Sequence, residues 1–265
     1  MTQATQTQQA LLEALAFQLE LGADEAIGEA PRDRFEETPP RRGADPAAPP
    51  AVPARPPAEA WQSALALARA AATLDELAEA MRRFEGSELR LGARNLVFAD
   101  GLPGARVMVI GEAPGGEEDR TGKPFVGRAG QLLDRMLAAI GLARTAPAPE
   151  DAVYITNILP WRPPGNRTPS EAEVLSFLPF VLRHVELAGP DFILALGGTS
   201  AKALLGTATG IKRLRGRWVR HEASALPLLP SFHPAYLLRA PADKRLAWRD
   251  LLSLRAALDG EAPDV

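Results

Sequence analysis

One stretch of the chain, residues 106–142, constrains the fold more than any other. It opens with an apolar run at residues 107–110, which is typical of a buried strand in a parallel sheet. A loop with several glycines, two prolines and four acidic residues follows. After Gly127, apolar residues recur every three or four positions, as in an amphipathic helix. Strand, loop and helix together predict the βα turn on which α/β folds carry their sites.

Two common phosphate-binding motifs do not fit this loop. A P-loop ends in Gly-Lys-Ser/Thr, whereas Gly122 and Lys123 are followed by Pro124. A dinucleotide fingerprint needs a second glycine two positions after the first, and Ala113 stands there after Gly111. The acidic side chains of the loop would also repel a pyrophosphate. The sequence therefore argues against nucleotide binding at this turn.

The rest of the chain predicts an α/β fold of three layers, α/β/α, with a four-stranded central parallel sheet. Helical periodicity separates the apolar runs, and helices are expected at residues 61–84 and 242–258 among others. Short outer strands are expected at residues 96–98 and 218–219. The four central strands are expected at residues 107–110, 153–158, 192–196 and 226–229.

Residue types suited to chemistry follow the ends of all four central strands. They are Gly111, Asn157, Gly197 and His233. Because the carboxyl ends of parallel strands meet at one edge of a sheet, we expect these positions to form a single site.

The first of these motifs resembles that of the uracil-DNA glycosylase superfamily, most closely its type-4 branch. The family pattern is GE(G/A)PGxxED, a short spacer and PFVGRAGQLL, and residues 111–119 and 124–133 match it almost letter for letter. Residues 232–239, FHPAYLLR, match the second motif. The resemblance covers about residues 84–258. It implies the superfamily fold and an enzyme of base excision repair that hydrolyses the N-glycosidic bond of uracil in DNA, leaving an abasic site.

The resemblance implies three catalytic residues, which are Glu112, Asn157 and His233. To be excised, a base must first leave the DNA stack. Hydrogen-bond donors must then stabilise the leaving base as it becomes an anion, and nearby anions must stabilise the cationic sugar. His233 would donate to uracil O2, and the Asn157 amide can pair with both O4 and N3–H. Glu112 would lie beside the base and the attacking water. Alone, a His-Pro turn or a strand-end Asn is more often structural, and the first motif favours the catalytic roles.

The resemblance implies further substrate contacts around the same loop. Phe125 would be the platform on which the flipped base stacks. Glu118 would pack where a thymine methyl group would have to fit, and Asp119 would hold the loop together. Ala113 stands where classical members carry a water-directing Asp. Water activation is therefore expected from Glu112 or to be weak.

DNA is the expected partner, although the net charge of the chain is −3. Residues 206–220 hold five basic residues and no acid, and they form either a phosphate contact or a solvated face. The start of the helix after Gly197 can bind a phosphate, and residues 236–239 resemble a loop that wedges into DNA. The expected DNA contacts are Arg128, Gly198, Thr199, Arg215, Tyr236, Leu237 and Arg239.

Most type-4 enzymes hold a four-iron cluster with four cysteines, and this chain has no cysteine. The ligand positions that the resemblance implies are occupied by Phe84, Ser87, Trp161 and either Ser176 or Phe177. We therefore expect no cofactor and no metal. Apolar packing around Phe84, Trp161 and Phe177 is expected instead.

Three regions are expected along the chain. Residues 1–35 predict a helical appendage, with its helix at 8–21 and an unidentified partner. Residues 36–58 predict a disordered linker rich in proline and alanine, and residues 59–260 the glycosylase-like domain. No run of 18 apolar residues occurs and the first ten residues lack a secretory pattern. We expect a cytoplasmic monomer with a nucleoid-associated activity and no membrane contact.

Two alternatives to uracil excision stay open. One is an enzyme of the same fold that acts on another deaminated or mismatched base, such as hypoxanthine, or thymine opposite guanine. The other is a protein that binds uracil or damage without cleaving. The sequence also leaves open the preference for single or double strands and the residue that activates water.

Overall fold

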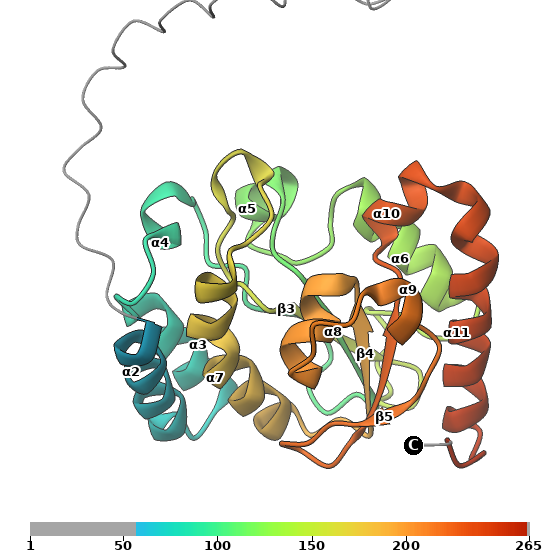
Figure 1. Cartoon of the computed structure of the whole chain (residues 1–265). Coiled ribbons are helices and arrows are strands. Elements are labelled where there is room, and N and C mark those ends of the chain that lie inside the picture. The colour runs from blue at the N-terminus through green and yellow to red at the C-terminus, as the bar shows by residue number, and fades with distance from the viewer. Residues whose placement is uncertain (1–56, 264–265) are drawn as a thin grey trace, which may run out of the picture. The chain divides into compact units, whose positions relative to one another are not determined.

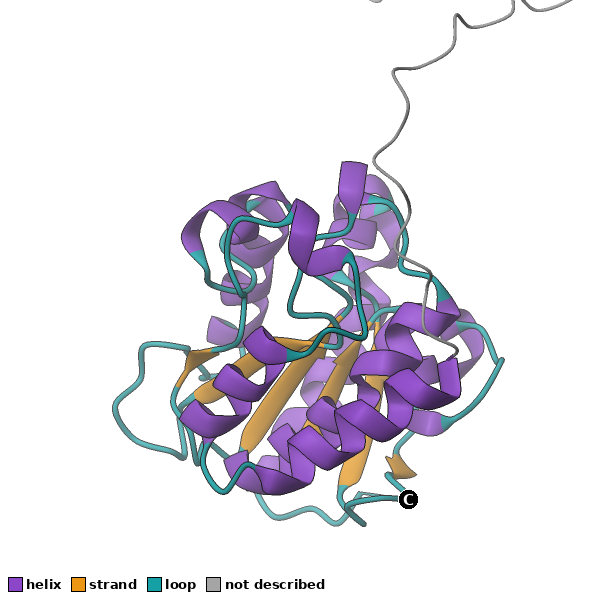
Figure 2. Ribbon diagram, turned by 90° about the vertical axis from the view of Figure 1, so that its left-hand side faces the viewer, coloured by secondary structure: helices purple, strands orange, loops and turns teal. Residues whose placement is uncertain are grey.

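The computed structural model of the protein describes residues 57–263. At its centre is a six-stranded sheet in the order β1-β3-β2-β4-β6-β5 (Figure 2). The four inner strands are parallel, which confirms the predicted α/β class and parallel sheet; they are β2 (Val107–Gly111), β3 (Val153–Asn157), β4 (Phe192–Leu196) and β6 (Pro227–Ser231). Antiparallel edge strands flank them, β1 (Asp100–Gly101) beside β3 and β5 (Val219–Arg220) beside β6.

Helices cover both faces of the sheet because successive strand side chains point to opposite sides. Val107 and Val109 of β2 pack with α6 (Arg128–Ala138) and α11 (Lys244–Leu258) on one face. Met108 and Ile110 pack on the other face with α7 (Glu171–Ala188) and α8 (Gly198–Leu205). This burial from both sides explains why the inner strands are continuously apolar.

Two further helices pack on the outer side of α7, as Figure 1 shows. The helix predicted at 61–84 is in fact two helices, α2 (Pro57–Ala70) and α3 (Leu74–Arg83). The chain breaks between them because the Thr73 hydroxyl accepts a hydrogen bond from the Glu76 N–H and so caps α3. A short helix, α4 (Leu89–Gly92), follows.

Two local predictions were wrong. Residues 96–98 are extended but do not form a strand, because Val97 donates to the Pro160 carbonyl outside any ladder. The loop after β2 contains the helix α5 (Gly116–Thr121). Acidic residues fill its first turn, where the helix dipole favours negative charge. The other short elements are η1 (Pro164–Asn166), α9 (Ile211–Leu214), α10 (Pro234–Arg239) and η2 (Pro241–Asp243).

The predicted N-terminal helix at 8–21 lies outside the described residues. The predicted linker at 36–58 overlaps the structure only at its end, where α2 already begins at Pro57. Proline suits the first turn of a helix because its missing N–H has no partner there. Within residues 57–263, none of the helices combines the length and the apolar character that crossing a bilayer requires.

Candidate active site

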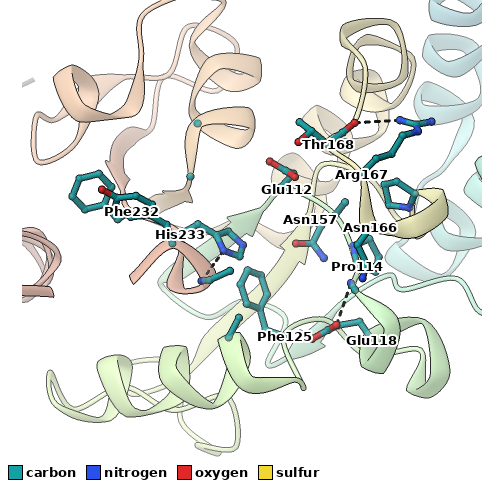
Figure 3. A pocket seen from close by; sticks show the side chains of 18 of the residues that line it. Glu112, Pro114, Glu118, Phe125, Asn157, Asn166, Arg167, Thr168, Phe232 and His233 are labelled. Atoms are coloured by element: carbon teal, nitrogen blue, oxygen red, sulfur yellow. Dashed lines mark hydrogen bonds between the residues drawn. The ribbon is translucent and has the colours of Figure 1, made fainter. Parts of the chain in front are cut away.

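A cavity of about 650 Å³ opens at the carboxyl ends of the four parallel strands. The four strand-end positions of the sequence analysis meet there, as the parallel topology predicts. Figure 3 shows the Asn157 side chain at the end of β3 and side chains from the segments after β2 and β6, among them Glu112 and His233, around the same space. The residues around it include Glu112, Ala113, Glu118, Phe125, Asn157, Gly197, Gly198, His233, Tyr236 and Arg239.

Asn157 faces this cavity from the end of β3. Its side chain is 6% exposed, and its amide makes no hydrogen bond to the described part of the chain and stays open to the cavity. Gly111 lies beside it in register on β2. A Cβ at Gly111 would overlap both the Asn157 amide oxygen and the Phe125 ring. The absence of a side chain at Gly111 therefore allows Asn157 and Phe125 to lie next to each other at the base of the cavity.

Phe125 forms the adjoining wall. Its ring is buried and stacks with the His233 ring, with 5.4 Å between centroids and 28° between planes. The backbone of Phe125 has φ 53°, which is unusual for a bulky residue. Gly130 of α6 makes room for this turn, because a Cβ there would overlap the Phe125 carbonyl.

His233 precedes α10 and caps it through its ring. The Ala235 N–H donates to His233 Nδ1 over 3.1 Å, so Nδ1 is an acceptor and the proton of a neutral ring lies on Nε2. The pKa of His233 is lowered to about 4, mainly by burial and also by the charge of Arg239, while Glu118 acts in the opposite direction. At neutral pH the ring is therefore an uncharged donor.

Glu112 extends into the cavity from the loop after β2. The Thr199 hydroxyl, in the first turn of α8, donates a hydrogen bond to Glu112 Oε2. This bond joins the loops after β2 and β4 and orients the carboxylate. The other carboxylate oxygen has no hydrogen-bond partner among residues 57–263 and can receive a proton from a water molecule.

Two of the other acids of the loop, Glu118 and Asp119, hold its backbone. Glu118 accepts hydrogen bonds from the N–H groups of Gly115, Val126 and Gly127 at 2.9 to 3.1 Å. Its carboxylate lines the cavity, yet these bonds occupy both oxygens, so its main task is to join α5 to the Phe125 turn. The buried Asp119 accepts from Arg94 and Asn95, which agrees with the predicted loop-holding role.

Comparison with known proteins identifies the family of this chain. The family model described as "Uracil DNA glycosylase superfamily" matches residues 98–252. The chain belongs to this superfamily. A Thermotoga maritima protein named type-4 uracil-DNA glycosylase is 35% identical over 194 residues, covering 71% of this chain and 96% of its own length. Relatives of the same name from Pyrobaculum aerophilum and Saccharolobus solfataricus are each 36% identical; the shared regions cover 67% and 71% of this chain, and 91% and 88% of theirs.

The residues at the cluster positions of the type-4 glycosylases do not fit an iron–sulfur cluster. Cluster iron is held by thiolates, and the chain has no cysteine. The Phe84 ring packs edge-on against Phe177 at 5.4 Å and Phe180 at 5.2 Å, and Trp161 lies in the same buried cluster. The predicted apolar packing is thus present. Among the described residues, acids, histidines and cysteines form no group that could hold a metal ion.

The structure corrects two of the expected DNA contacts of this glycosylase-superfamily chain. The Arg215 guanidinium already pairs with Asp250 and donates to the Leu246 carbonyl, and its side chain is partly buried. Leu237 is 0% exposed because α10 turns it into the core beside Phe232. Of the other expected contacts, Gly198 and Tyr236 line the cavity, the Thr199 hydroxyl is used by Glu112, and Arg128 and Arg239 are exposed.

The sequence analysis missed one side of the cavity. Asn166, Arg167 and Thr168, in the loop after β3, line it (Figure 3). Arg167 is held by a bidentate pair with Glu173 at 2.6 and 2.8 Å. The signal was available, because this proline-rich loop directly follows the carboxyl end of a predicted central strand.

Acid should weaken this fold before its carboxylates titrate. Burial lowers the pKa of His184 to about 3 and contributes to a pKa of about 4 at His233, against an ordinary 6.5. Below pH 6.5 these two histidines bind protons in the unfolded chain but stay neutral in the folded chain. The free energy of unfolding therefore falls as pH decreases. We expect a loss of up to about 1.4 kcal/mol per pH unit for each histidine between pH 6.5 and 4.5.

Urea unfolding at several pH values measures this loss. Glu173, whose pKa is lowered to about 2 mainly by its hydrogen bond with Arg167, adds to the loss only below about 4.5. A double variant, His184→Gln with His233→Asn, should show a clearly shallower slope in that window. An unchanged slope would contradict the assignment to the two histidines.

Proposed function

We propose that this protein hydrolyses the N-glycosidic bond between uracil and deoxyribose in DNA and leaves an abasic site. The observation that carries the proposal is the open Asn157 amide, which faces the same cavity as the neutral His233 ring and the Phe125 ring. A planar base with one donor and two acceptors on its edge matches these groups. The names of the relatives support the same activity.

Recognition would take place on a base that has left the DNA stack. The base would stack on Phe125, while the Asn157 amide donates to O4 and accepts from N3–H. Cytosine presents the opposite pattern at these two positions, so a fixed amide rejects it. The Asn157 and Phe125 side chains both pack against Gly111, and this close contact gives the discriminating groups little freedom.

Hydrolysis would break the bond from C1′ to N1 and form a bond from C1′ to a water oxygen. The electron pair of the broken bond passes to the base, and the His233 Nε2–H donates a hydrogen bond to O2 as charge develops there. Glu112 would accept the proton of the water and stabilise the cationic sugar. Ala113 supplies no carboxylate, so this task depends on Glu112.

The surroundings of the cavity support DNA as the partner. Arg128 and Arg239 are exposed, and Tyr236 and Gly198 line the cavity, so phosphate and base contacts can form there. We place the activity in residues 59–260 and expect a monomer that acts in the cytoplasm on chromosomal DNA. Neither an iron–sulfur cluster nor another cofactor takes part in this proposal.

Strand cleavage by alkali after incubation with a labelled single-uracil oligonucleotide tests the proposal. The purified protein is assayed in EDTA, beside thymine, hypoxanthine and mismatch controls. We expect cleavage at uracil only. Cleavage at hypoxanthine or at mismatched thymine would indicate a different base specificity. Uracil-dependent binding without any cleavage would indicate a recognition protein instead.

A further inference from the structure

Arg144 is a buried guanidinium outside the cavity to which no role has been given so far. It lies between α6 and β3, and its side chain is only 12% exposed. Arginine has five N–H donors in a rigid fork. Arg144 uses four of them in hydrogen bonds to two carboxylates and two carbonyls, and its Nη2 also forms an ion pair with Asp134.

These contacts tie the loop that carries Pro124 and Phe125 to β1 and α6. Nη1 donates to Asp100 of β1 at 3.0 Å and to the Pro124 carbonyl at 2.9 Å. Nη2 donates to the Phe125 carbonyl at 2.8 Å and pairs with Asp134 of α6 at 2.8 Å. Arg144, which does not line the cavity, thus holds the Pro124 and Phe125 carbonyls in place.

The Phe125 backbone needs such an anchor. A bulky residue at φ 53° is disfavoured without support from its surroundings. If the two carbonyls lost their donors, the peptide could relax toward negative φ. The ring that depends on this peptide would then leave its stacked position beside His233.

We propose that Arg144 is a positioning residue for the base platform: it fixes the Pro124 and Phe125 carbonyls and thereby the Phe125 ring. The proposal rests on the proposed function, because it assigns the ring to uracil. Arg106 makes a comparison possible, because it also binds a carboxylate, that of Asp191, and a backbone carbonyl, that of Leu258, but it does so at the opposite end of β2.

Arg144→Lys tests the proposal, with Arg106→Lys as the matched control. Lysine keeps the charge but lacks the fork that reaches two carbonyls. We expect Arg144→Lys to lower kcat/KM on single-uracil DNA by roughly 10- to 100-fold, since small misplacements of binding groups have effects of this size. Arg106→Lys should change it less than about twofold, even where urea midpoints show similar destabilisation of both variants.

A double-mutant cycle separates positioning from general loosening. If Arg144 acts through the ring, Arg144→Lys should have little further effect on kcat/KM in a Phe125→Ala background. Additive losses would overturn the proposal. If Arg144→Lys does not fold, Asp134→Asn replaces it, because this change weakens the anchor but keeps both carbonyl bonds. Asp134→Asn should give a smaller loss of kcat/KM, and this loss should also disappear in the Phe125→Ala background. An equal loss in the wild-type and Phe125→Ala backgrounds would overturn the proposal.

Binding provides a readout independent of turnover. An oligonucleotide with non-cleavable 2′-fluoro-2′-deoxyuridine is compared with one that carries an abasic analogue at the same position. Arg144→Lys should reduce the preference for the uracil oligonucleotide by roughly 10-fold, with unchanged affinity for the abasic one. Wild-type protein without any uracil preference would contradict the proposed function. A preserved preference in Arg144→Lys, with wild type selective, would contradict only the role of Arg144.

Discussion

Asn157→Asp is expected to reduce uracil excision by roughly 10³-fold. The change keeps the size of the side chain but replaces its donor by an acceptor, so O4 of uracil would face a carboxylate instead of an N–H. One hydrogen bond is lost and one buried acceptor is left unsatisfied, which together cost about 4 kcal/mol. Single-turnover rates on a single-uracil oligonucleotide measure the effect.

Comparison with Asn157→Ala shows whether pairing or shape is responsible. Alanine removes the amide and leaves room for water, so its loss should be smaller than that of the isosteric aspartate. Urea midpoints of both variants and their affinity for uracil-free DNA serve as controls and should stay close to wild type. Equal activity of Asn157→Asp and wild type would rule out uracil reading by this amide.

His233→Ala is expected to slow excision by roughly 10²- to 10³-fold, the usual effect of removing one donor to a developing anion. Alanine also removes the cap of α10, which costs about 1 kcal/mol of stability. His233→Asn separates these effects, because asparagine is a good cap but does not present the Nε2–H. We expect His233→Asn to be as stable as wild type and as slow as His233→Ala.

The pH profile adds a second check on His233. Because the pKa of the ring is about 4, wild-type activity should not decline as pH falls through 6.5. A histidine with an ordinary pKa would change its charge in that range. A decline centred near pH 6.5 that is absent from His233→Asn would contradict the neutral-donor role.

The sequence predicted the sheet and the edge that carries the site because both follow from local patterns. Apolar runs of about five residues define the buried strands, and the rule that parallel strands end at one edge places Asn157 and His233 together. The edge strands are two residues long each, so no periodicity could locate them. Residues 96–98 form no strand because Val97 donates to the Pro160 carbonyl outside any ladder, and this long-range contact cannot be read from a three-residue pattern.

The side-chain partners of the site could not be read from the chain. Thr199 and Glu112 are 87 residues apart, and only the three-dimensional arrangement of the loops shows their hydrogen bond. A run of basic residues predicts a DNA contact at Arg215, but its partner Asp250 lies 35 residues further on and only the folded chain shows that the two side chains are paired. Such a run of basic residues predicts a positively charged surface, but it does not reveal which of these side chains already pair with an acid.

The aromatic packing between α3 and α7 has a consequence for how the protein is made. At the positions where the resemblance implies cluster ligands, this chain needs only side-chain packing, since Phe84, Trp161, Phe177 and Phe180 fold against one another. We expect the yield of folded protein to be independent of iron supply and of oxidants such as peroxide.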